Sequence, residues 1–153
     1  MRAVLGLPSR ARMEAPMQEM RASFEKLMGE VAKANGWEMT TEGDSCVLTV
    51  ELKEGRRQQV RVTTGVDHMR NPTVLFYSKV GLLKDVEPER ALRANAITSY
   101  GALAAVGDDL VMRGSTFVGP GSLTAKELGT MIRHIALYAD HMERELYGKQ
   151  DRF

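Results

Sequence analysis

The sequence has a single cysteine, Cys46, among its 153 residues. This excludes an intramolecular disulfide, and a zinc site built from cysteine ligands is not expected. Cys46 falls in an alternating apolar row, which predicts a thiol buried in the core. Burial raises the pKa of a thiol, so we expect Cys46 to be inert rather than reactive.

Long apolar runs are also missing. None approaches the roughly 20 residues that a membrane helix needs, so no membrane insertion is expected. Residues 1–16 contain three arginines but only a short apolar stretch, residues 3–7, which lacks the apolar core of a secretory signal. We therefore expect residues 1–16 to form a flexible arm on a cytoplasmic protein.

An excess of charge of either sign is absent as well. The 21 basic residues nearly balance the 20 acidic ones, for a formal net charge of +1. Arg56, Arg57 and Arg61 form a small basic patch, but there are few aromatic residues nearby. We expect no nucleic-acid partner. With 43% apolar and 27% charged residues, the composition is that of one folded globular domain.

Two amphipathic helices are predicted at the ends of this domain. The first covers about residues 17–35, with Pro16 in its first turn and Gly36 just past its end. The last begins at a capping box formed by Thr124 and Glu127 and runs to about Tyr147. Its apolar row is Leu128, Met131, Ile132, Ile135, Ala139, Met142 and Leu146.

Between these helices, residues that alternate between apolar and polar predict strands. The expected strands are 37–41, 46–53, 60–66, 73–80, 102–106 and 110–118, with a helix from residue 85 or 87 to about 99. Short hairpin connections favour antiparallel pairing. The sequence thus predicts an α+β fold with an antiparallel sheet of about five strands packed against helices, in the order α-β-β-β(-β)-α-β-β-α. We expect one domain, residues 17–148, followed by a C-terminal tail, residues 149–153.

This order, together with one local pattern, resembles the type III secretion chaperone-like superfamily, which includes the YbjN-like proteins. In that family the central helix carries a leucine and an asparagine at a short spacing, and here the matching stretch is Leu92-Arg93-Ala94-Asn95. A strand pair and a long amphipathic helix, residues 123–146, follow it. The resemblance covers residues 17–147. It implies a compact bacterial chaperone-like sandwich, often a homodimer, with no active site, whose secretion-chaperone branch binds an extended client segment on an apolar surface.

The residues themselves show no strong catalytic or metal-binding pattern. His134, Tyr138, His141 and Glu145 share one face of the last helix. However, the two histidines are seven residues apart, about 10.5 Å along a helix, too far to share one ion easily. The serines have no nucleophile elbow around them, and residues 114–121 lack the lysine of a phosphate loop. We therefore predict no enzyme activity, cofactor or metal.

The predicted function is non-catalytic binding of a client protein by a cytoplasmic homodimer, because apolar burial drives most protein association. Asn95 is unusual within a helix, and we expect its amide to bond a neighbouring strand or loop, or else a client. The candidate partner or dimer residues are Met131, Ile135, Tyr138, Met142, Leu146 and Asn95. A small-ligand sensor, which needs a closed apolar pocket, is the alternative.

Overall fold

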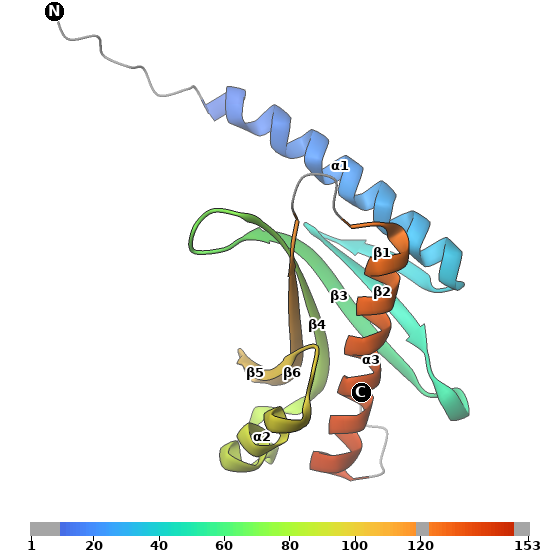
Figure 1. The fold of residues 1–153 in the computed structure, drawn as a ribbon, viewed down its shortest axis with the longest axis vertical. Coiled ribbons are helices and arrows are strands. Elements are labelled where there is room, and N and C mark those ends of the chain that lie inside the picture. Colours follow the sequence, from blue (N-terminus) through green and yellow to red (C-terminus); the bar gives the residue numbers. More distant parts are fainter. Residues whose placement is uncertain (1–9, 119–122, 149–153) are drawn as a thin grey trace, which may run out of the picture.

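A computed structural model describes residues 10–118 and 123–148, with side chains described from residue 21 onward. Its three α-helices and six strands are drawn in Figure 1. The helices are α1 (Arg10–Asn35), α2 (Pro88–Ala94) and α3 (Ala125–Tyr147). The strands are β1 (Glu38–Glu42), β2 (Ser45–Glu51), β3 (Arg57–Val66), β4 (Pro72–Leu82), β5 (Ala102–Val106) and β6 (Asp109–Phe117).

The strands form one antiparallel sheet in the order β1-β2-β3-β4-β6-β5. The predicted α+β class and the antiparallel pairing are confirmed. The sheet has six strands rather than about five, because the short first strand pairs with β2 along its whole length, from Glu38 to Glu42. The short first strand, which the predicted order left open, is therefore present as β1.

Two helix boundaries differ from the predictions. Helix α1 begins at Arg10 rather than near Met17, so residues 10–16 of the predicted arm are helical, and Pro16 lies inside the helix. Helix α2 ends at Ala94, and the chain continues as a 3₁₀ turn, Asn95–Ile97, rather than as helix to residue 99. The tail, residues 149–153, and residues 1–9 lie outside the described residues.

The core lies between one face of the sheet and the helices α1 and α3 (Figure 1). Alternate residues of each central strand face the helices and are buried, as the patterns of β2, β3 and β4 show. Phe76, Leu48, Met112 and Ile132 are fully buried there. Cys46 belongs to the same layer and is 2% exposed, and burial, helped by the charge of Glu25, raises the pKa of its thiol.

The end of α3 is fixed to β4 by an aromatic side chain. The Tyr147 hydroxyl donates a hydrogen bond to the Leu82 carbonyl oxygen at 2.8 Å. Its ring lies against the backbone of Gly81, where any Cβ would overlap the ring. Burial, with a contribution from the charge of Asp85, raises the pKa of Tyr147. A residue without a side chain at position 81 is therefore needed for this contact.

Replacing Gly81 by alanine should consequently destabilise the protein by about 1–3 kcal/mol, the usual cost of overpacking a core. Gly29→Ala is the matched control, because nothing lies within 4 Å of its Cβ and it sits inside a helix. That change should leave stability unchanged or raise it by about 0.5–1 kcal/mol. Urea unfolding measures both, and equal stabilities for the two variants would contradict the contact.

Candidate partner-binding surfaces

The predicted interface residues of α3 mostly face the core. Ile135 and Met142 are each 1% exposed and Leu146 is 8% exposed, so a partner cannot reach them in this fold. These side chains are buried because the apolar row of α3 faces the sheet. Met131 and Tyr138 are partly buried and pack against the same core. The exposed apolar surface therefore comes from other elements.

Asn95 bonds the edge strand β5. Its Oδ1 accepts the Leu103 amide proton at 2.6 Å, and its Nδ2 donates to the Leu103 carbonyl oxygen at 3.3 Å. Strands β5 and β6 are joined by a two-residue turn, so Val106 and Ala104 bond β6, and the backbone groups of Leu103 point to the free edge. The Asn95 amide therefore stands in for a neighbouring strand at this position, as the structural interpretation predicted.

The sheet face opposite the helices is polar. Within the described residues no helix covers it, and ion pairs cross its strands. The pairs are Arg57–Glu51 at 3.0 Å, Arg61–Glu42 at 2.5 Å and Lys79–Asp109 at 2.8 Å. Val47 and Val111 on this face are only 6% and 7% exposed, and they line a hollow whose other lining residues include Arg61, Lys79 and Asp109. This face resembles an ordinary solvated surface rather than an apolar binding site.

An apolar groove lies on the helix side of the sheet, between α1, the β3–β4 hairpin and the start of α3. Its volume is about 400 Å³, and none of its lining residues is charged. The groove is lined by Ser23, Phe24, Leu27, Thr64, Gly65, Val66, Pro72, Thr73, Val74, Val118, Leu123 and Leu128. Val66 at its rim is 69% exposed. This groove combines size with an apolar lining, the combination typical of binding sites.

The rim of the groove is held by a hydrogen-bonded loop. Asp67 Oδ1 accepts the amide protons of Met69 and Asn71, each at 2.8 Å, and Asp67 Oδ2 accepts from Asn71 Nδ2 at 2.9 Å. The Asn71 side-chain bond is the main reason that the pKa of Asp67 is lowered. These bonds fix the turn that carries Val66 and Pro72 into the groove.

The far wall of the groove is the first turn of α3. The predicted capping box is present, because Glu127 N donates to Thr124 Oγ1 at 3.2 Å and Thr124 N donates to Glu127 Oε2 at 2.8 Å. The bond from the Thr124 backbone N–H, followed by a bond from the Thr124 hydroxyl at 2.9 Å, lowers the pKa of the Glu127 carboxyl. Leu123 precedes the cap, and Leu128 lies at the fourth helical position, the two places that form a hydrophobic staple.

A second group of exposed apolar side chains, the α2 patch, lies near the other end of β4. It consists of Leu92, Ile97 and Tyr100, which are 57–68% exposed and lie within one short stretch of chain at and after α2. The Tyr100 ring also stacks on His134 of α3, with centroids 4.6 Å apart. Exposed apolar residues gathered in one region, rather than scattered singly, favour contact with another protein.

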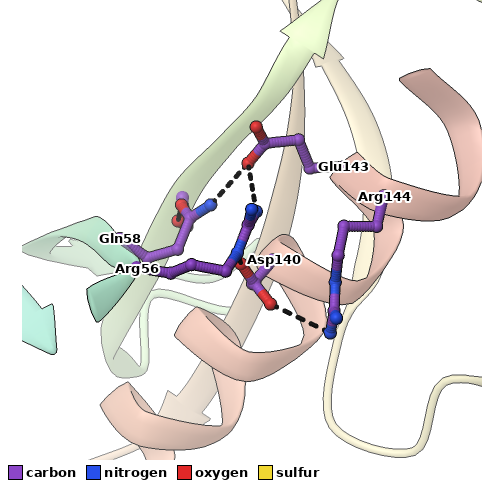
Figure 2. Close-up of polar contacts among 6 residues, drawn as sticks. Arg56, Gln58, Asp140, Glu143 and Arg144 are labelled. Carbon is purple, nitrogen blue, oxygen red and sulfur yellow. Dashed lines mark hydrogen bonds and ion pairs between the residues drawn. The ribbon is translucent and has the colours of Figure 1, made fainter. Parts of the chain in front are cut away.

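A buried polar cluster ties α3 to the turn between β2 and β3 (Figure 2). Arg56 Nε donates to Asp140 Oδ1 at 2.5 Å, and Arg56 Nη2 lies 3.8 Å from Glu143 Oε2. The side chains of Arg56, Asp140 and Glu143 are only 13%, 7% and 1% exposed. Arg144 adds a second guanidinium 3.2 Å from Asp140 Oδ2, so two carboxylates face two positive charges.

Neutral groups complete the cluster. Gln58 Nε2 donates to Glu143 Oε2 at 2.9 Å, and Ser78 Oγ lies 2.9 Å from Gln58 Oε1. Buried titratable groups often mark active sites. Here, however, each of these side chains is engaged by another member of the cluster, the arrangement that a structural network requires. The cluster therefore fixes the orientation of α3 over the sheet.

Sequence reasoning did not find this cluster, although a signal for it exists. Gln58 continues the inward-facing row of Val60 and Val62, and Asp140 and Glu143 interrupt the buried face of α3. A polar residue on an apolar row must find a buried partner. The partners are separated by more than 80 residues, which a spacing pattern within one element cannot reveal.

Within the part of the chain that the structure describes, no three His, Cys, Asp or Glu side chains are grouped to hold a metal ion. His68 is exposed in the β3–β4 loop, while His134 packs on Tyr100. Over residues 10–118 and 123–148, no helix is both long and apolar enough to span a membrane.

The comparisons with known proteins bear on the fold. No family model matches the sequence, and no curated protein matches it. A chain of the solved HopA1–SchA chaperone–effector complex is similar in structure, with a TM-score of 0.57 and 8% sequence identity. The match covers 82% of this chain and 97% of that chain. This likeness shows that the α+β fold, with its six-stranded antiparallel sheet, is similar to the fold of a chain in a chaperone–effector complex, in agreement with the fold that the resemblance implied.

Replacing Arg56 by methionine should destabilise the protein by about 3–5 kcal/mol, because Asp140 and Glu143 lose their buried guanidinium partner. Arg93→Met is the matched control. Arg93 pairs with Glu89 on the surface, with side chains 78% and 72% exposed, so its loss should cost less than about 1 kcal/mol. Denaturant unfolding followed by circular dichroism measures the difference, and a similar small effect for both variants would contradict a structural role for the cluster.

Asn95→Ala should expose the backbone groups of Leu103, and Asn95→Asp should retain the acceptor while removing the donor. An open sheet edge recruits other strands, so we expect self-association to be lowest in the wild type, higher in Asn95→Asp and highest in Asn95→Ala. The amide proton of Leu103 should also exchange faster in Asn95→Ala than in the wild type. Light scattering and hydrogen exchange test this, and unchanged exchange at Leu103 in the alanine variant would refute edge closure.

Proposed function

We propose that this chain is a non-catalytic, chaperone-like module that binds an apolar segment of a client protein in the groove between α1, the β3–β4 hairpin and α3. The observation that carries the proposal is the groove itself, about 400 Å³ with no charged lining residue. An uncharged groove binds an uncharged apolar segment, because burying a charge there without a partner is costly. The similar chain in the HopA1–SchA complex, a chaperone–effector complex, supports a protein client.

The remaining surfaces are less suited to a client. The open sheet face carries ion pairs, and the β5 edge is bonded by Asn95. Met28 and Val31 of α1 and most of the apolar row of α3 are buried in the core. Among the described surfaces, we assign binding to the groove and to the α2 patch.

We assign the α2 patch to a second copy of the chain, which makes the proposed assembly a homodimer. Leu92 and Ile97 are 68% and 67% exposed, and a second copy that covered them would remove apolar surface from water. The patch and the groove lie on different elements, so dimerisation leaves the groove free. The YbjN-like affiliation and the cytoplasmic location stay predictions of the sequence.

A small-ligand function is the second candidate, because the groove volume falls within the roughly 300–1,000 Å³ of ligand pockets. The groove is open rather than closed, and its only polar side chains are hydroxyls. Such a site offers little to orient a polar metabolite, whereas it accepts apolar side chains of a protein.

Two charge substitutions separate the groove from the dimer. Val66→Asp places a carboxylate at the groove rim and should weaken binding of a blocked leucine- and valine-rich peptide at least about ten-fold, because a bound apolar peptide would remove water from the carboxylate. Leu92→Asp should leave peptide binding intact but convert the dimer to a monomer. Both positions are well exposed, so the fold should survive.

Fluorescence anisotropy with the labelled peptide and light scattering supply the two measurements, with a blocked serine-rich peptide as the negative control. Peptide affinity that is unaffected by Val66→Asp would place the client elsewhere. A wild-type chain that is monomeric at tens of micromolar would remove the homodimer from the proposal.

A further inference from the structure

Leu123 holds a strained backbone conformation beside the groove. Its φ is 62°, in the left-handed region that a leucine rarely adopts, because Cβ crowds the following carbonyl oxygen. The next residue, Thr124, caps α3, and Leu123 packs partly against the core. Such strain persists only where the surroundings enforce it, and it often marks functional positions.

The Leu123 side chain lies between two hollows. One is the apolar groove, and the other is a shallower hollow of about 550 Å³ along the first turns of α3. The second hollow is lined by Thr116, Leu123, Thr124, Lys126, Glu127, Thr130 and Met131. Leu123 is the residue shared by both linings. Its side chain therefore forms the partition between them.

The two hollows differ in chemistry. The groove has no charged lining residue, whereas the second hollow has Lys126 and Glu127. An uncharged apolar segment fits the first, and a polar continuation fits the second. The position of Leu123 thus marks where the apolar part of a bound segment must end.

We propose that Leu123 is the specificity-determining residue of the groove: it limits the length of the apolar segment that the groove accepts. This inference rests on the proposed binding function of the groove. Each methylene buried in an apolar site raises affinity about four-fold, until the site is full. Replacing leucine by alanine removes three carbons, so the accepted chain should lengthen by about three methylenes.

A series of straight-chain alcohols from hexanol to tetradecanol tests the limit, because these probes are uncharged and differ only in length. Displacement of the apolar dye N-phenyl-1-naphthylamine reports their affinity. For the wild-type chain, affinity should rise with each methylene and then level off. In Leu123→Ala affinity should level off at a chain about three methylenes longer than in the wild type, and in Leu123→Gly, which removes four carbons, at one about four methylenes longer.

Two controls separate the partition from a general loss of structure. Leu137→Ala removes an exposed leucine from α3 that lines neither hollow, and the levelling point should not move. Leu123→Gly should unfold at higher urea than Leu123→Ala, because glycine accepts a φ of 62° without strain. The glycine variant therefore keeps the test usable if the alanine variant is unstable.

Alcohols that bind the wild-type chain, with the same levelling point in both Leu123 variants, would overturn this inference and leave the binding function standing. A wild-type chain that binds none of the alcohols but binds the blocked apolar peptide would overturn this inference alone, and one that binds neither would overturn both. If the chain length at which affinity levels off increases in the Leu123 variants but not in Leu137→Ala, the result supports Leu123 as the partition between the two hollows.

Discussion

Burial of one sheet face under α1 and α3 is the constraint on which the other features depend. Phe76, Leu48 and Ile132 form the centre of this layer and are fully buried. Because the apolar rows of the strands and of α3 are used there, they are not available to a partner. The surfaces that remain are set by what this packing leaves uncovered, chiefly the groove beside α1 and the α2 patch.

The buried polar cluster makes the packing specific. An apolar helix on an apolar sheet can slide or rotate at little cost, whereas Arg56 can meet both Asp140 and Glu143 in one orientation. Such clusters add little net stability, but losing one partner is costly. By fixing α3, the cluster also fixes the first turn of that helix, where Leu123 and Leu128 form the far wall of the groove.

The sequence predicted the elements whose pattern is local. Strands such as β5 and the capping box at Thr124 follow directly from alternation and from residue spacing. The early end of α2 was missed because Asn95 bonds Leu103, a tertiary contact that no helix propensity contains. Residues such as Ile135 were assigned to an interface because an apolar stripe does not reveal whether sheet or partner covers it.

The groove itself was beyond sequence reasoning for a similar reason. Its walls come from α1, from the β3–β4 hairpin and from the start of α3, which are brought together only by the sheet. Each of its residues, such as Phe24 or Val74, reads as ordinary core when taken alone. Only the arrangement of these elements shows that the helices leave the groove open.

The most direct test of the central claim is a map of amide chemical-shift changes in the labelled protein as a blocked apolar peptide is added. The account predicts saturable shifts that cluster at groove residues, including Leu27, Val66 and Val118, while the open sheet face around Arg61 stays unchanged. Shifts confined to that polar face, or no saturable shifts anywhere, would contradict it.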